Sequence, residues 1–189
     1  MSEETTPNTI KIEVAQADLK EALQVAVTTV SNQSDITSHF VFTLAGQDLF
    51  VLSTHLPRTF SKTPVFNATV TYEEDAPESG RFTVDAKSIL QALSVTTGLV
   101  TMTYDGQGSV SFSNDKGSLY FNSLDPTSFP DWEAKLTKAQ ANAVTVPVDV
   151  LSESLAAVKP CVSTNEVARQ ELTVIAFVNG IAYACDSYV

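Results

Sequence analysis

The segment Ile10-Lys11-Ile12-Glu13-Val14 and the nine residues after it decide the fold, because their pattern occurs three times in the 189 residues. The other copies begin with Arg81-Phe82-Thr83-Val84 and with Ala143-Val144-Thr145-Val146. In each copy Val ends the strand-like run, an aliphatic residue follows five positions later, and Leu follows four positions after that: Val14, Leu19 and Leu23; Val84, Ile89 and Leu93; Val146, Leu151 and Leu155. Alternation places every second side chain on one face of a strand, and the i, i+4 spacing places both aliphatic residues on one helical stripe. This template therefore predicts a strand, a tight turn and an amphipathic helix.

A predicted hairpin follows each predicted helix. The turns are Ala45-Gly46-Gln47-Asp48, Asp105-Gly106-Gln107-Gly108 and Asn179-Gly180. Asp-Gly and Asn-Gly between β-rich runs indicate hairpins, because these residues tolerate positive φ. The first two copies add a third strand, predicted near residues 66–72 and 117–122. The repeating unit is thus β-α-β-β-β, and the fold class is α+β, with two helices packed on antiparallel sheets.

The spacing of the template valines predicts the domains. Val14 and Val84 are 70 residues apart, and Val84 and Val146 are 62 residues apart. We expect a disordered tail at 1–8, a first domain at 9–137 made of two repeats, and the first half of a second domain at 138–189. We expect this second domain to be truncated, so that the chain is part of a longer one or is completed by a partner. In the linker, Phe129 and Trp132 are predicted to anchor the chain against the sheet, or else to form an exposed contact for a partner.

The composition excludes several classes of protein. Hydrophobic residues make up 43% of the chain and charged residues 17%, which suits a folded core rather than a disordered tail. The net charge of −11 argues against binding nucleic acid through an overall basic surface. The chain has no apolar run long enough to span a membrane and no secretion signal, which predicts a cytoplasmic protein. Cys161 and Cys185 lack metal-site spacing and are predicted to be reduced thiols.

The sequence carries no recognised catalytic motif. His39 and His55, the only histidines, lie in strand-rich segments without a matched nucleophile. Gly106-Gln107-Gly108 lies between two predicted strands, where it indicates a hairpin rather than a nucleotide loop. We therefore expect a protein that is not an enzyme and that uses no cofactor or metal.

The order of the predicted elements, taken with four local segments, carries a family resemblance over about residues 9–189. The segments are 10–23, Arg81-Phe82-Thr83-Val84-Asp85-Ala86-Lys87, Leu119-Tyr120-Phe121-Asn122-Ser123-Leu124-Asp125-Pro126-Thr127-Ser128-Phe129-Pro130-Asp131-Trp132, and Ala184-Cys185-Asp186-Ser187-Tyr188. They resemble the DNA sliding clamp family, in particular the β subunit of bacterial DNA polymerase III and its phage or mobile-element relatives.

The resemblance implies a processivity factor in DNA replication that works by topology. A ring of such subunits, formed by self-association, encircles duplex DNA without sequence preference and tethers a DNA polymerase. The implied partners are duplex DNA, the polymerase and a clamp loader. The alternative is a clamp-like protein-interaction module that does not encircle DNA. A third alternative is an unrelated β-rich structural protein whose repeats arose by chance.

The helix faces opposite the aliphatic stripes supply the candidate DNA contacts. These candidates are Lys20 and Gln24 on the first helix, Lys87 and Gln91 on the second, and Lys159 near the end of the third. Lysines are suited to phosphates, and glutamines to hydrogen bonds with the backbone of DNA, directly or through water. The alternative is that these side chains are simply solvated. Glu21 and Glu153, on the same faces, depart from a basic lining.

Overall fold

The computed structural model of the chain describes residues 9–55, 59–73, 78–132, 137, 144–163 and 173–186. The chain divides into unit 1, Met1–Trp132, and unit 2, Glu133–Val189, and each unit is considered by itself. The expected tail at 1–8, most of the predicted linker after Trp132, and Ala143 lie outside the described residues.

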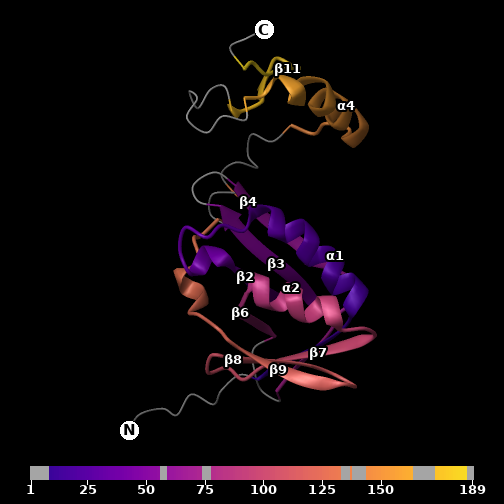
Figure 1. The fold of residues 1–189 in the computed structure, drawn as a ribbon, viewed down its shortest axis with the longest axis vertical. Helices are drawn as coiled ribbons and strands as arrows, with labels where there is room; N and C mark the ends of the chain where they lie inside the picture. Colours follow the sequence, from indigo (N-terminus) through magenta and orange to yellow (C-terminus); the bar gives the residue numbers. More distant parts are fainter. Residues whose placement is uncertain are drawn as a thin grey trace. The chain divides into compact units, whose positions relative to one another are not determined.

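Unit 1 contains two consecutive copies of the predicted repeat (Figure 1). Each begins with a strand and a helix, and each continues with antiparallel strands. The elements in chain order are β1 (Ile10–Ala15), α1 (Gln16–Ala26), the 3-10 turns η1 (Val27–Thr29) and η2 (Ile36–Ser38), β2 (His39–Ala45), β3 (Asp48–His55), β4 (Thr59–Val65), β5 (Thr69–Tyr72), β6 (Ser79–Asp85), α2 (Ala86–Val95), β7 (Leu99–Tyr104), β8 (Ser109–Asn114), β9 (Gly117–Asn122) and the 3-10 turn η3 (Pro126–Ser128).

The two repeats exchange their first strands. Sheet A has the strand order β5-β1-β7-β8-β9, and sheet B has the order β4-β3-β2-β6. The first strand of repeat 1, β1, therefore pairs with β7 of repeat 2, and β6 of repeat 2 pairs with β2 of repeat 1. The registers correspond, since Val14 lies opposite Val100 and Val84 lies opposite Phe40. Neither repeat can complete its sheet without the other.

The template residues form the centre of one core between the sheets and the helices. Their six side chains in unit 1 are all fully buried: Val14, Leu19, Leu23, Val84, Ile89 and Leu93. Three stacked rings join the two sheets, with Phe82 lying 5.0 Å from Phe42 and 5.3 Å from Tyr104 between ring centroids. The repeated pattern thus exists because each copy buries its apolar face against the other.

The third strand of the first repeat differs from the prediction of one strand near 66–72. The structure has two strands, β4 in sheet B and β5 in sheet A, joined by a turn in which Asn67 has a φ of 57°. The run Thr59-Phe60-Ser61-Lys62-Thr63-Pro64-Val65 is an edge strand, so its side chains are mostly exposed or half-buried and lack a clear apolar alternation. Pro64 is tolerated there, because an edge strand has one unpaired side. The second repeat has its third strand, β9, where it is predicted.

The segment after β9 is fixed to the outside of sheet B, as the first of the two alternatives for Phe129 and Trp132 predicts. Phe129 packs with Val41 and Leu52, and the ring of Trp132 stacks on Phe60 with a centroid distance of 5.6 Å.

Unit 2 contains a single copy of the template. Its described elements are α4 (Val148–Val158), the 3-10 turn η4 (Lys159–Cys161), and the antiparallel strands β10 (Ala176–Val178) and β11 (Ile181–Tyr183). Asn179 and Gly180 both have positive φ, which confirms the predicted Asn-Gly turn. The predicted first strand is not formed at residues 144–146. Among the described residues of the chain, no helix is long and apolar enough to cross a membrane.

Candidate nucleic-acid interface

Helices α1 and α2 lie side by side in unit 1 (Figure 1). Each buries one stripe and turns the rest of its surface outward. The buried stripes are Leu19, Ala22, Leu23 and Ala26 on α1, and Ala86, Ile89, Ala92 and Leu93 on α2. A shift of 70 residues carries three positions of one stripe onto the other, so the two outward faces are equivalent surfaces.

The two helices are held to each other at their ends. Ala15, at the N-cap of α1, offers no capping side chain. Instead the backbone N–H of Gln16 donates to the carbonyl of Gly98 at 2.8 Å, and the Gln16 amide Nε2 donates to the carbonyl of Leu93 at 2.8 Å. The start of α1 is thereby tied to the end of α2 and to the loop after it. This role of Gln16 was not predicted, because the sequence does not reveal which carbonyl lies nearby.

Helix α2 starts with a side-chain cap. Asp85 Oδ1 accepts a hydrogen bond from the backbone N–H of Ser88 at 2.8 Å. A carboxylate at this position satisfies an otherwise unpaired N–H group and interacts favourably with the helix dipole. The prediction that Asp85 lies at a helix start is confirmed, and Asp149 lies in the first turn of α4.

Four of the five candidate contacts lie on this helical layer. Gln24 on α1 and Lys87 and Gln91 on α2 are exposed, and Lys20 on α1 is half-buried. Lys159 begins η4 in unit 2 and is exposed.

The charge of the helical layer is balanced rather than basic. Helices α1 and α2 contain two basic residues, Lys20 and Lys87, and two acidic residues, Asp18 and Glu21. Asp18 Oδ2 also accepts a hydrogen bond of 3.0 Å from the amide of Asn67. The helices therefore carry no net charge in a chain with a net charge of −11.

Two exposed valines occupy equivalent positions on this layer. Val25 on α1 is 53% exposed, and Val95 on α2 is 77% exposed. The template did not single them out, although their separation of 70 residues is the repeat length. They give both helices an apolar contact point beside the polar candidates.

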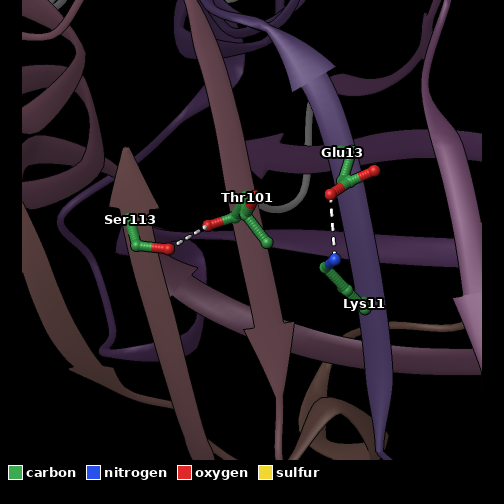
Figure 2. A network of polar contacts seen from close by, with 4 residues as sticks. All are labelled: Lys11, Glu13, Thr101 and Ser113. Atoms are coloured by element: carbon green, nitrogen blue, oxygen red, sulfur yellow. Dashed lines mark hydrogen bonds and ion pairs between the residues drawn. The ribbon is translucent and has the colours of Figure 1, made fainter. Parts of the chain in front are cut away.

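The outer face of sheet A is a different kind of surface. Side chains of Lys11, Glu13, Thr101 and Ser113 lie on neighbouring strands of this face (Figure 2). Lys11 Nζ is 2.9 Å from Glu13 Oε1, and the Ser113 hydroxyl donates to the carbonyl of Thr101 at 3.4 Å. An exposed ion pair of this kind contributes little to stability. Polar residues that pair among themselves form a solvated sheet face.

The β7–β8 turn contains a carboxylate, Asp105, whose pKa is shifted by backbone hydrogen bonds. The hydrogen bond from the backbone N–H of Ser109, with a further one from Gln107, lowers the pKa of Asp105. Burial, followed by the nearby carboxylates of Asp105 and Asp125, raises the pKa of Tyr104. Asp105 thus stabilises the turn in its ionised form.

No group of acidic, histidine and cysteine side chains in the described part of the chain is arranged to hold a metal ion.

Comparison with known proteins identifies the architecture. No family model matches the sequence, and no curated protein matches it. Among solved structures, the DNA polymerase sliding clamp from Bacillus subtilis superposes with a TM-score of 0.65 at 17% identity, over 88% of this chain and 43% of that one. The C. crescentus β sliding clamp gives a TM-score of 0.69 at 15% identity, over 96% of this chain and 49% of that one. The chain has the sliding-clamp fold.

A third solved clamp has a similar fold. The Helicobacter pylori β clamp bound to a DNA ligase peptide superposes with a TM-score of 0.61 at 17% identity, over 87% of this chain and 44% of that one. The chain therefore spans less than half the length of the solved clamps that it matches. At these identities the comparison shows the clamp fold alone.

Proposed function

We propose that the chain is a sliding clamp subunit, or the N-terminal part of one, that encircles duplex DNA and tethers a replicative polymerase. The clamp fold of unit 1, with its two equivalent helices on one layer, is the observation that carries this proposal. The proposed partners are duplex DNA, a DNA polymerase, a clamp loader and further copies of the subunit in a ring. The proposed location is the cytoplasm of a bacterial or phage-infected cell.

The charge of the chain is compatible with such a role. A protein that binds DNA through a basic surface needs lysines and arginines to neutralise phosphates, and its affinity for DNA falls steeply as the salt concentration rises. A ring holds DNA by topology, so its inner surface needs only to avoid repulsion. The neutral helical layer supports this mode, since Lys20 and Lys87 balance Asp18 and Glu21.

In this proposal the polar side chains of the layer make weak, sequence-independent contacts with the DNA backbone. Lys20 and Lys87 approach phosphates, and Gln24 and Gln91 bind backbone oxygens, directly or through water. Lys159 extends the same role to unit 2. No catalytic step is proposed, and no cofactor or metal takes part.

Charge reversal tests the assignment of the layer. The variant Lys20→Glu with Lys87→Glu should shorten retention of the native protein on nicked circular DNA, because the layer then repels phosphates. The matched control is Lys116→Glu, an exposed lysine between β8 and β9, which should leave retention unchanged. Equal retention of the double variant and the control would refute the DNA-facing assignment.

The alternative function is a clamp-like interaction module that does not encircle DNA. The exposed Val25 and Val95 favour it, because apolar side chains on an outward helix face suit a protein partner. Under this alternative, Val25→Asp with Val95→Asp removes partner binding, and the lysine reversals have no effect on DNA.

A further inference from the structure

Strand β5 is an edge strand of sheet A. It pairs with β1 on one side, and no strand of the described part of the chain pairs with its other side. An unpaired edge presents backbone N–H and C=O groups that a strand of another molecule can bind, and folded proteins protect such edges. The contacts of β5 show how this edge is protected.

The side chain of Gln47 occupies the open side of β5. The backbone N–H of Val70 donates to Gln47 Oε1 at 3.1 Å, and Gln47 Nε2 donates to the carbonyl of Val70 at 2.9 Å. The amide thus satisfies both outward backbone groups of this residue. Gln47 belongs to the β2–β3 turn of sheet B, so a turn of one sheet closes an edge of the other.

These two hydrogen bonds have the same form as the bonds between two strands. In an antiparallel ladder, the two residues of a hydrogen-bonded pair exchange one N–H···O bond in each direction. A glutamine amide carries a carbonyl acceptor and an NH₂ donor, just as a peptide group carries C=O and N–H. Gln47 therefore takes the place that a residue of a neighbouring strand would have opposite Val70.

The turn that carries Gln47 is itself fixed by hydrogen bonds. The Tyr72 hydroxyl donates to the carbonyl of Gly46 at 2.7 Å, and the backbone N–H of Gly46 donates to the carbonyl of Glu78 at 2.8 Å. Gly46 has a φ of 58°, which glycine adopts readily. Tyr72 is the last residue of β5, so the turn is tied to the strand that it protects.

Repeat 2 closes a sheet edge in a related way. Strand β6 is an edge strand of sheet B, and its Thr83 N–H donates to the hydroxyl of Ser123, in the segment after β9, at 2.8 Å. The backbone N–H of Ser123 donates in turn to the carbonyl of Gly108, in the β7–β8 turn of sheet A, at 2.8 Å. Both repeats thus use a hairpin turn of one sheet to close an edge of the other. In repeat 1 the closure of Val70 depends on one side chain.

We propose that Gln47 prevents sheet A from pairing through β5 with the same edge of a second molecule. Without this side chain, Val70 of each copy presents a free N–H and a free C=O, and two copies pair as antiparallel strands about a two-fold axis. Val70 then lies opposite Val70 of the other copy, and Thr71 lies opposite Thr69. The side chains of Thr69 and Thr71 are exposed and leave this approach open. The proposal does not depend on the proposed function.

The mass of the variant Gln47→Ala in solution tests the proposal. Light scattering at rising concentration should show the mass increase toward at least twice that of the wild-type chain at the same concentration, whatever oligomer the wild-type chain forms. Gln16→Ala is the matched control, because it removes an amide hydrogen bond of 2.8 Å to the Leu93 carbonyl at a helix end rather than at a sheet edge. It should leave the mass unchanged. Equal masses of Gln47→Ala and wild type at every concentration would overturn the proposal.

A charge on the strand separates edge pairing from a loss of stability. A lysine on an edge strand opposes pairing with a second edge, and Thr71→Lys places one at an exposed position of β5. The double variant of Gln47→Ala and Thr71→Lys should have the wild-type mass. Association of the double variant as strong as that of Gln47→Ala would place the contact elsewhere and would refute the proposal.

Hydrogen exchange tests the closure of the edge in dilute protein, where copies do not associate. In Gln47→Ala the backbone N–H of Val70 should exchange roughly tenfold faster, because it has lost its acceptor. The N–H of Thr71 is directed to the β1 side and should exchange as in the wild-type chain. An unchanged rate at Val70, or an equal rise at Thr71, would show that Gln47 does not close this edge.

Discussion

The stacked rings at the centre of unit 1 allow a sharp test of the core. Phe82 is fully buried on β6 and lies between Phe42 of sheet B and Tyr104 of sheet A. Phe82→Ala removes the ring that joins the two sheets. Since each sheet is completed by a strand of the other repeat, the substitution weakens the contact between the repeats as well as the core.

The expected loss of stability is large. Truncation of a buried Phe to Ala costs about 3–5 kcal/mol in the free energy of unfolding, from lost transfer energy and from the cavity that remains. Each aromatic pair contributes about 0.5–1.5 kcal/mol beyond its buried area, which places Phe82 in the upper part of this range. For an m-value of about 2 kcal/mol/M, the midpoint of urea unfolding falls by about 2 M.

The assay is urea unfolding followed by far-ultraviolet circular dichroism and by the fluorescence of Trp132, the only tryptophan of the chain. Phe66→Ala is the matched control, because Phe66 is 70% exposed and its truncation should change the free energy of unfolding by no more than about 0.5 kcal/mol. Phe82→Leu should cost less than Phe82→Ala, because it keeps most of the buried apolar volume and loses the two ring contacts. A loss below about 1.5 kcal/mol for Phe82→Ala, or an equal loss for Phe66→Ala, would refute this description of the core.

Three further predictions concern polar and aromatic contacts. Asp85→Ala removes the N-cap of α2 and should lower the free energy of unfolding by about 1 kcal/mol in urea titrations; no change would show that the cap is not formed. The lowered pKa of Asp105, due first to the Ser109 N–H, means that its stabilising effect is complete above the ordinary Asp pKa and is lost as the pH falls through the folded-state pKa. Asp105→Asn should therefore flatten the acid side of the stability profile, and an unchanged profile would contradict this. Trp132→Ala loses the stacking on Phe60 and should cost about 1–2 kcal/mol in thermal unfolding, whereas an unaltered transition would show that the segment after β9 is not anchored.

The repeat could be predicted from the sequence because the strand residues and the helix residues of the template are buried in the same core. Val14, Leu19 and Leu23 must all face one core, so strand and helix periods leave a visible spacing that recurs 70 residues later. The hairpin turns could also be predicted, because Gly46 and Gly106 have positive φ at the hairpin tips, and glycine adopts this conformation readily. Strand β4 was not predicted, because the sequence of this edge strand contains exposed polar residues and Pro64 and shows no apolar alternation.

The pairing between repeats and the details of the helical layer depend on tertiary contacts. No local pattern specifies that β1 pairs with β7 rather than with a strand of its own repeat. Helical periodicity predicted that Gln24, Lys87 and Gln91 are exposed, and they are. The hydrogen bond from Gln16 to Leu93 arises only once the two helices are adjacent.

The most direct test of the proposed function is release from DNA when a circle is opened. The native protein is placed by a clamp loader on nicked circular DNA, freed of unbound protein, and followed after the circle is cut once by a restriction enzyme. A clamp held by topology should stay on the circle at high salt and slide off the linear DNA within the assay. Protein that leaves both forms equally as salt is raised, or stays on both, would contradict the proposal that this chain encircles DNA.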